Sequence, residues 1–251
     1  MSHPWQHAAQ KAAEIWRRAH MAIAMTGAGI SVPSGIPDFR SPGGLWTKYD
    51  PNDVATFGAL RTRPKRVWEF LLAADKLMGT AKANPGHKAL ARIEQAGLLT
   101  AVLTQNIDGL HQAGGSQRVV EFHGSARRFY CMSCKLDHDP EAIASLTQDD
   151  IPWTCECGGV IRPDFVFFGE HIPAAALSES LDLAARADVA VVVGTSGTVA
   201  PFNTLPHRVK ANGGSVIEVN LHASEYGSLA DVVVQGPAED ILPYVADLLE
   251  A

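Results

Sequence analysis

The sequence predicts an α/β fold in which a Rossmann-like parallel sheet domain carries an inserted small zinc-binding domain. Short apolar runs with the character of buried strands alternate with helix-like segments over most of the chain. The first of these runs opens into a glycine-containing turn at residues 26–40, as nucleotide sites of parallel sheets do. Four cysteines within one short window interrupt the alternation and indicate a metal-bearing module.

The length and composition agree with this fold class. A chain of 251 residues is long enough for one large domain with an inserted module. Its 46% hydrophobic and 19% charged residues are typical of a globular protein, and no apolar run approaches the length of a membrane span. The net charge of −6 argues against a dedicated nucleic-acid surface. Residues 1–10 lack the pattern of a secretory signal, so we expect a cytoplasmic protein of unknown oligomeric state.

The first elements are a helix and a strand. Apolar residues at helical spacing predict an amphipathic helix over Pro4–His20, and Met21–Met25 reads as a buried strand. Gly27 and Gly29 follow it and would let backbone amides approach a pyrophosphate. Val32 stands where a strict dinucleotide fingerprint has its third glycine, so the turn by itself is either a nucleotide site or an ordinary strand-to-helix turn.

The next stretch leads from a loop into two helices. Residues 41–58 are rich in Pro, Gly and Asp, which predicts a long loop over a site or the start of the inserted module. Pro64–Met78 has the apolar surface of a helix. A second helix is expected over Asn84–Gln95, with Asn84 as its cap and Gly97 ending it.

Two further strands deliver polar residues at their carboxyl ends, where parallel sheets place ligand sites. Leu98–Thr104 leads into Gln105–Asp108, and Val119–Phe122 leads into His123. Asn106 and Asp108 are two residues apart, so in an extended chain they would point the same way. Asp108 is also suited to an Asx turn beside Gly109, and both interpretations stay open.

Ser125–Arg162 has little periodic hydrophobicity and is the inserted module. The alternation then resumes with a final set of predicted helices and strands: a helix over Ala174–Arg186, a strand over Val189–Val193, a helix over Phe202–Ala211, strands over Ser215–Val219 and Val232–Val234, and a helix over Ala238–Glu250.

The four cysteines are predicted to bind one zinc ion. Cys131 and Cys134 are separated by two residues, twenty residues follow before Cys155, and one residue separates it from Cys157. This spacing resembles zinc patterns in which four thiolates surround the ion at about 2.3 Å, and four thiolates leave no open position, so the ion would be structural. A redox pair or four unrelated buried cysteines are the alternatives.

Several stretches together resemble the sirtuin family over nearly the whole chain. These are GAGIS at 27–31, SGIPDFR at 34–40, TQNIDGLH at 104–111, FHG at 122–124, RPD at 162–164, FGE at 168–170 and GTS at 194–196. The resemblance implies an NAD-dependent protein lysine deacylase that consumes NAD and yields nicotinamide, O-acyl-ADP-ribose and free lysine. Its partners would be acyl-lysine proteins or peptides. A protein mono-ADP-ribosyltransferase using the same NAD site is the alternative, followed by an NAD-sensing module and a dehydrogenase.

The resemblance also implies the roles of individual residues. His123 would be the general base, although a lone histidine is more often structural, and Asn106 and Asp108 would act beside it. The cofactor set would be Gly27, Ala28, Gly29, Ser31, Val32, Asp38, Phe39, Arg40, Gln105, Asn106, Ile107, Asp108, His123, Gly194, Thr195, Ser196, Asn220, Leu221 and Ala238. The substrate set would be Phe165, Val166, Phe168, Gly169 and Glu170. The zinc ligands would be Cys131, Cys134, Cys155 and Cys157.

The same resemblance divides the chain and limits the acyl group. Residues 1–40, 84–124 and 170–251 would form the NAD-binding domain, residues 41–83 a lid and the helical part of the small domain, and residues 125–169 the zinc module with the substrate-channel strand. Sirtuins that remove succinyl or malonyl groups carry a Tyr-x-x-Arg pair, whose matching positions here are Leu71 and Ala74. Acidic acyl groups are therefore disfavoured.

Overall fold

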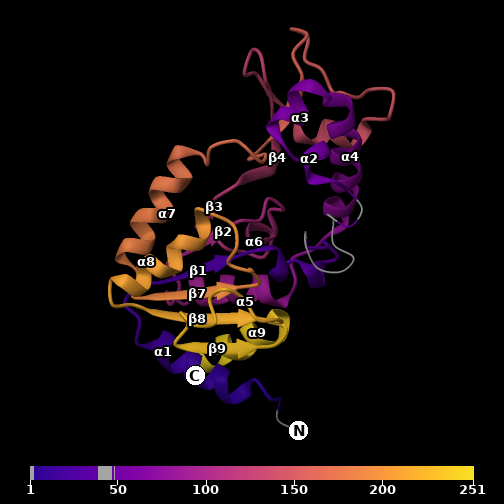
Figure 1. The fold of residues 1–251 in the computed structure, drawn as a ribbon. Helices are drawn as coiled ribbons and strands as arrows, with labels where there is room; N and C mark the ends of the chain where they lie inside the picture. Colours follow the sequence, from indigo (N-terminus) through magenta and orange to yellow (C-terminus); the bar gives the residue numbers. More distant parts are fainter. Residues whose placement is uncertain (1–2, 39–46, 48) are drawn as a thin grey trace.

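A computed structural model describes residues 3–38, 47 and 49–251. It contains a six-stranded parallel sheet with strand order β3-β2-β1-β7-β8-β9 and a three-stranded antiparallel sheet with order β5-β4-β6 (Figure 1). The predicted fold class is confirmed. The strands of the large sheet are β1 (Ala22–Thr26), β2 (Ala101–Thr104), β3 (Val119–Glu121), β7 (Val189–Val193), β8 (Ser215–Asn220) and β9 (Val232–Gln235).

The strand order places a topological switch point between β1 and β7. From β1 the chain builds the sheet outward through β2 and β3, and it returns on the other side of β1 with β7, β8 and β9. β1 pairs with both β2 and β7 along its whole length or nearly so. In sheets of this kind, ligands bind outside the carboxyl ends of the strands at the switch point.

Helices cover both faces of the large sheet. One face packs against α1 (Gln6–Arg17), α5 (Pro85–Gln95) and α9 (Ala238–Glu250), and the other against α7 (Ala174–Arg186) and α8 (Leu205–Ala211). Successive side chains of β1 alternate between the two cores, as the period of a strand requires. Because both faces are covered, β1 and β7 are buried at every position.

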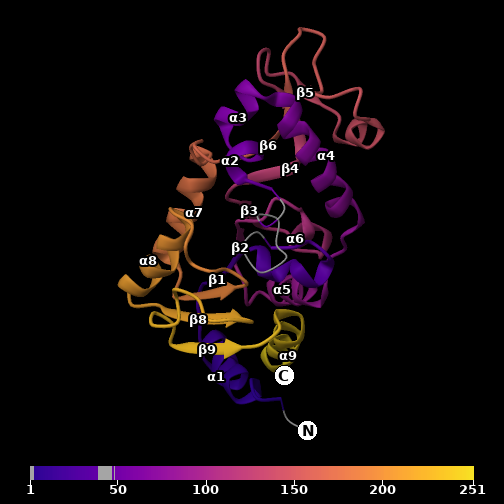
Figure 2. The ribbon, with the colours of Figure 1, turned by 45° about the vertical axis from the view of Figure 1, so that its right-hand side comes forward.

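The small sheet forms a separate lobe with the helices that precede it (Figures 1 and 2). Its strands are β4 (Gly124–Cys131), β5 (Asp137–His138) and β6 (Ile161–Phe165). α2 (Pro51–Val54), α3 (Phe57–Thr62) and α4 (Pro64–Thr80) pack with these strands around a third core. Trp68 of α4 lies in that core and contacts the rings of Phe129 and Trp153. Its indole N–H donates a hydrogen bond to the Ile161 carbonyl at 3.0 Å. The short helix α6 (Leu110–Ala113) follows β2 at the large sheet.

Most predicted elements are present, several with the expected ends. Asn84 caps α5 by accepting hydrogen bonds from the amides of Gly86 and His87, and Gly97 beyond the helix has a positive φ of 76°. α7, β7 and α9 have the predicted bounds. The expected helix over 202–211 divides into a short 3₁₀ turn over Phe202–Thr204 and α8.

Three expectations were wrong in part. The expected loop over 41–58 contains α2 and the start of α3, which are capped by Asp50 and Thr56. The expected strand from Leu98 begins only at Ala101. The segment after Ser125 holds β4, which the sequence hid because Arg127 and Arg128 are exposed and its register shifts between Ser125 and Phe129. The domain boundaries stay a prediction.

Within the described part of the chain, no helix is long and apolar enough to cross a membrane.

Candidate active site

The turns after β1 and β7 pack directly against each other at the switch point. The Gly29 amide donates to the Gly194 carbonyl at 2.8 Å, and the Gly27 amide donates to the Val193 carbonyl at 3.0 Å. A Cβ at Gly29 would lie 2.7 Å from the Gly194 Cα, and one at Gly194, where φ is 61°, would lie 2.4 Å from the Ile30 nitrogen. Glycine is therefore required here to bring the two turns together.

Asn106 and Asp108 meet at one serine. Ser31 donates its hydroxyl hydrogen to Asp108 Oδ2 at 2.7 Å and accepts a hydrogen bond from Asn106 Nδ2 at 3.1 Å. Asn106 Nδ2 also donates to the Gly27 carbonyl at 3.1 Å, while Asp108 Oδ1 accepts from the Leu110 amide at 2.9 Å. The two side chains do point to the same place, and Asp108 also forms the Asx turn that was the alternative. Both interpretations hold together.

Two buried histidines lie behind this cluster. His87 Nε2 is 3.4 Å from the Ser31 hydroxyl, and His111 Nε2 is 2.8 Å from the Thr26 hydroxyl. Burial lowers the pKa of His87 to about 4, against a smaller opposing effect of Asp108. Burial also lowers the pKa of His111 well below its usual value, so both rings are neutral at pH 7. No local pattern in the sequence ties His87 to Ser31, so this contact was not predicted.

His123 is oriented by a backbone carbonyl. Its Nδ1 lies 3.1 Å from the Gln105 carbonyl oxygen, which only accepts hydrogen bonds, so Nδ1 carries the proton and Nε2 keeps its lone pair. Burial lowers the pKa of His123, and the Gln105 carbonyl opposes this effect. The lowered pKa keeps the ring neutral at pH 7, which is the form that can accept a proton.

The residues expected around the other half of the cofactor lie at the carboxyl ends of β7 and β8. Gln105 Nε2 donates to Thr195 Oγ1 at 2.8 Å, which joins the β2 side of the crevice to the β7 side. Asn220 Nδ2 donates to the Thr195 carbonyl at 3.1 Å. Ser196 bonds Thr198 rather than a member of this group, and Leu221 is 58% exposed. Ala238, at the start of α9, packs into the sheet core.

The remaining expected cofactor residues are distributed around the first turn. Val32 is 45% exposed and Asp38 is half-buried. Ala28 begins the 3₁₀ turn after β1, and the Ile107 carbonyl accepts from the Ala126 amide at 3.0 Å. Phe39 and Arg40 lie outside the described residues.

The expected substrate segment begins beside His123. The Val166 amide donates to the His123 carbonyl at 2.9 Å, and Phe168 exchanges backbone hydrogen bonds with Ala55 and Phe57 of the helical part. The Phe168 side chain is 49% exposed, while Phe165 and Phe167 stack with centroids 4.8 Å apart.

A buried ion pair, which the sequence did not predict, joins the last residue of the expected substrate segment to β6. Arg162 donates to both oxygens of Glu170, at 2.5 and 2.8 Å, and also to the Phe165 carbonyl. Its guanidinium lies over the rings of Phe167 and Tyr130, at 4.8 and 5.5 Å. Glu170, expected to contact substrate, is therefore occupied by Arg162 and by the Phe167 amide.

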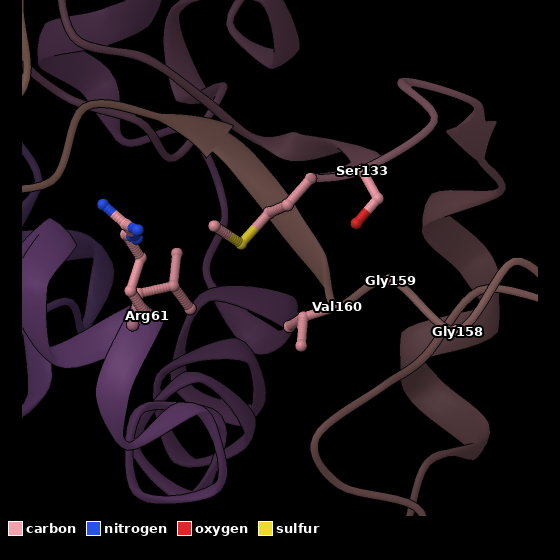
Figure 3. Close-up of a pocket in the computed structure, with 7 residues that line it drawn as sticks. Arg61, Ser133, Gly158, Gly159 and Val160 are labelled. Carbon is pink, nitrogen blue, oxygen red and sulfur yellow. The ribbon is translucent and has the colours of Figure 1, made fainter.

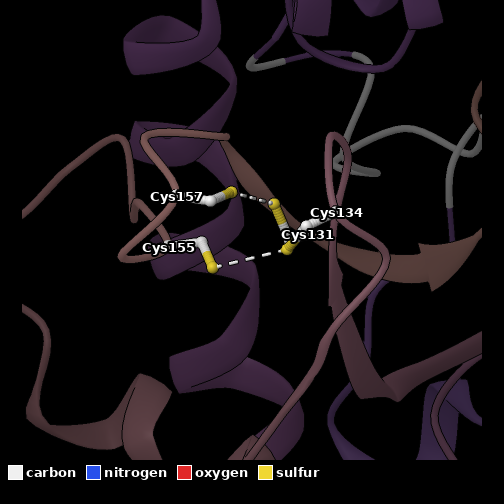
Figure 4. Close-up of side chains that lie close together, drawn as sticks. All are labelled: Cys131, Cys134, Cys155 and Cys157. Carbon is white, nitrogen blue, oxygen red and sulfur yellow. Dashed lines mark hydrogen bonds between the residues drawn. The ribbon is translucent and has the colours of Figure 1, made fainter.

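The four cysteine sulfurs converge at one point in the small lobe (Figure 4). Cys131 Sγ lies 3.5 Å from Cys157 Sγ, Cys134 Sγ lies 3.7 Å from Cys155 Sγ, and all four lie within 4.8 Å of one another. Four thiolates around a tetrahedral zinc at about 2.3 Å stand about 3.8 Å apart, so the cluster fits the ion. A Cβ at Gly159 would lie 2.6 Å from Cys131 Sγ, which explains the glycine after the tight second pair.

Comparison with protein families decides the identity of this arrangement. The model described as the Sir2 family matches residues 27–201, which run from the first glycine turn through the cysteine cluster to the turn after β7. The chain belongs to the Sir2 family. Members of this family are also called sirtuins.

Individual sirtuins resemble the chain over almost its whole length. An NAD-dependent protein deacetylase of Sulfurisphaera tokodaii is 43% identical over 242 residues, covering 96% of both chains. An NAD-dependent protein deacylase of Thermococcus kodakarensis is 45% identical over 236 residues, covering 92% of both. A solved complex of a Sir2 homologue with NAD matches with a TM-score of 0.89 at 34% identity, covering 96% of this chain and 93% of that one.

The sirtuin crevice of this chain has groups that suit NAD. The backbone amides of Ala28 and Thr195, in the two facing turns, have no acceptor among the described residues, so they are free to bind a diphosphate. The Nε2 lone pair of His123 is likewise without a described partner. These free groups lie at the strand ends on both sides of the switch point, as an extended dinucleotide requires.

A separate hollow of the sirtuin small lobe lies away from these groups, between α3 and the cysteine-bearing loops (Figure 3). Its lining is Leu60, Arg61, Met132, Ser133, Gly158, Gly159 and Val160. None of the expected cofactor or substrate residues lines it.

Proposed function

We propose that this sirtuin removes uncharged acyl groups from protein lysines, consuming NAD and releasing nicotinamide, O-acyl-ADP-ribose and free lysine. The observation that carries the proposal is the state of His123. Its Nδ1 is committed to the Gln105 carbonyl, and its Nε2 keeps a lone pair beside the crevice. A neutral imidazole held in one tautomer is suited to take a proton from a ribose hydroxyl.

The Ser31 cluster supports a second part of the reaction. Both hydrogens of Asn106 Nδ2 are taken by the Gly27 carbonyl and the Ser31 hydroxyl, so the amide is held in one orientation. In the proposal Gln105 and Asn106 position the nicotinamide ribose, and Ile107 and Asp108 contact the nicotinamide. Pre-positioned polar groups act without reorganisation when the bond to nicotinamide breaks.

The remaining cofactor contacts of the proposal follow the two turns. Gly27, Ala28, Gly29, Ser31 and Val32 would surround the diphosphate, and Asp38, Phe39 and Arg40 would close over the ribose. Gly194, Thr195, Ser196, Asn220, Leu221 and Ala238 would hold the adenosine half. The free amides of Ala28 and Thr195 support this placement.

The acyl-lysine is proposed to bind along Phe165, Val166, Phe168 and Gly169. Val166 is bonded through its backbone to His123, so this segment brings a bound peptide close to the general base. Peptide binding by strand addition uses main-chain hydrogen bonds, and side-chain selectivity should be modest. A solved complex of Sir2 with a p53 peptide and NAD, with a TM-score of 0.86 at 33% identity, supports a site of this kind.

A cytoplasmic location belongs to the same proposal.

Uncharged acyl groups are favoured because the helix near the channel offers no cation at the two matching positions. Leu71 of α4 is 6% exposed and packs in the core of the small lobe, and Ala74 is half-buried. Neither side chain can pair with an acyl carboxylate. A related structure, that of Sir2Af2 with a myristoylated histone peptide, shows an uncharged acyl chain bound to a relative with a TM-score of 0.84.

Mass spectrometry of the products tests the proposal. Acetyl-lysine and succinyl-lysine versions of one peptide are incubated with the enzyme and NAD. We expect O-acetyl-ADP-ribose and free lysine from the first, and at least about tenfold less product from the second, the effect of one unpaired carboxylate. Desuccinylation faster than deacetylation would refute the acyl preference. A stable ADP-ribose adduct on a protein acceptor without deacylation would favour mono-ADP-ribosyl transfer instead.

A further inference from the structure

At the end of β8, the side chain of Asn220 is held in one orientation by two hydrogen-bond acceptors. Its Nδ2 donates to the Thr195 carbonyl at 3.1 Å and to Glu218 Oε1 at 2.7 Å. A carbonyl and a carboxylate can only accept hydrogen bonds, so turning the Asn220 amide over would place its Oδ1 against two acceptor oxygens. Asn220 Nδ2 therefore faces the Thr195 carbonyl and Glu218, and Asn220 Oδ1 accepts from no described residue.

Glu218 is the group that maintains this orientation. It is 1% exposed, and its Oε1 also accepts the hydroxyl hydrogen of Ser224 at 2.6 Å. Its Oε2 is buried without a partner in the described structure. The hydroxyl of Tyr226 is buried nearby in the same condition, and the charge of Glu218, after burial, helps to raise its pKa. Burying a carboxylate is costly unless it is hydrogen-bonded, and the side chains bonded to Glu218 are those of Asn220 and Ser224.

Asn220 lies on the opposite side of the switch point from His123. β8 is separated from β1 by β7, whereas His123 follows β3 on the other side of β1. A dinucleotide bound across the switch point, with its reactive ribose at His123, therefore has its other nucleoside over β7 and β8. This step rests on the proposed function.

The charged groups around this end of the crevice are mainly acidic. Glu218 is buried in β8, which the loop 221–231 follows, and Glu239 and Asp240 lie in the first turn of α9. The chain contains no Lys or Arg after Lys210, and His222 is the one basic group of the loop. Sites that bind the 2′-phosphate of NADP normally provide an arginine, whereas sites selective for NAD provide a hydrogen-bond acceptor for the free 2′-hydroxyl.

We propose that Glu218 is a positioning residue that makes this sirtuin select NAD over NADP. By holding Asn220 Nδ2 inward, it presents Oδ1 to the adenosine ribose, where a hydroxyl donates a hydrogen bond. A 2′-phosphate dianion has no hydrogen to donate and meets both Oδ1 and the buried charge of Glu218. The selection is thus made by a residue that does not itself touch the cofactor.

The test measures binding without turnover. Isothermal titration compares ADP-ribose with 2′-phospho-ADP-ribose for the wild type, for Glu218→Gln and for the control Glu225→Gln. The control removes the same charge from the loop after β8, where Glu225 is exposed and makes no hydrogen bond to the Asn220 amide. A glutamine at 218 can donate to Asn220, so the amide is free to reverse and present Nδ2.

We expect the wild type to bind ADP-ribose at least about 100-fold more tightly than 2′-phospho-ADP-ribose. Glu218→Gln should reduce this ratio of the two affinities about tenfold, the effect of one charge-assisted hydrogen bond. The control should keep the wild-type ratio. Equal binding of both ligands by the wild type, or equal ratios in the two variants, would overturn the proposal. Thermal unfolding shows whether Glu218→Gln is folded, and Glu218→Asp, which restores the charge, should recover part of the ratio. Selective ADP-ribose binding by a protein that deacylates no peptide would contradict the proposed function alone.

Discussion

The two sheets of this molecule are stabilised in different ways. The central strands of the large sheet are buried on both faces between two hydrophobic cores. The small sheet has a single core beside α2, α3 and α4, and it depends in addition on the cysteine cluster and on the Arg162–Glu170 pair. A small unit buries a smaller share of its surface than a large one, so a metal site or a buried ion pair contributes a larger share of its stability. Substitutions in the cysteine cluster or in the Arg162–Glu170 pair should therefore destabilise the small lobe and leave the large sheet intact.

Removal of a zinc ligand is expected to have the largest effect. Cys155→Ser replaces a buried ligand, and structural zinc sites supply about 10 kcal/mol or more of folding free energy. Hydrogen exchange should increase through β4, β5 and β6 and remain protected in β1 and β7. Turnover of acetyl-lysine peptide should fall at least about 100-fold, because Phe165 and Phe167 of the proposed substrate segment pack in the destabilised lobe.

Ser133→Ala is the matched control, since Ser133 lies between two ligands and only its backbone amide contacts a cysteine sulfur. It should keep one zinc per chain and full activity. Uniform loss of protection in both sheets of Cys155→Ser would contradict the separation of the two regions.

Removal of the buried ion pair is expected to have a smaller effect on the same lobe. Arg162→Met leaves Glu170 without its cation, and breaking a buried pair in this way costs about 3 kcal/mol of unfolding free energy. Because Arg162 also bonds the Phe165 carbonyl, the KM for acyl peptide should rise while ADP-ribose affinity stays unchanged. Chemical denaturation and steady-state kinetics measure the two quantities.

Arg128→Met provides the comparison for a surface pair. Arg128 binds Glu121 and Asp164, but its side chain is 54% exposed, so the loss should stay within about 1 kcal/mol. If both variants lost the same stability, burial would not be the reason that Arg162 matters.

The two regions also differ in how well the sequence predicted them. β7, α7 and α9 were predicted to the residue, because apolar periodicity and flanking turn residues report burial between two layers. The zinc ligands followed from cysteine spacing alone. β4 was missed because exposed arginines break its alternation, and α2 and α3 were missed because Pro, Gly and Asp suggested a loop where Asp50 and Thr56 are helix caps.

The candidate site was predicted as far as short motifs reach. The glycine turn and Gln105 after β2 meet the turn after β7 at the switch point, and His123 bonds the Gln105 carbonyl beside them. Three pairings were not predicted: His87 with Ser31, Arg162 with Glu170, and Glu218 with Asn220. The His87–Ser31 pair joins residues 56 positions apart and depends on tertiary packing, for which a single sequence carries no local signal. Glu218 and Asn220 are alternate residues of one strand, so strand periodicity could have indicated their contact.

The account depends most directly on the role of His123 as general base. The deciding measurement is the rate of O-acetyl-ADP-ribose formation by wild type and His123→Ala, with ADP-ribose affinity measured on the same samples. We predict a loss of at least about 100-fold in rate, as for removal of a general base, with affinity within about threefold of wild type. An unchanged rate in a variant that binds ADP-ribose normally would contradict the account.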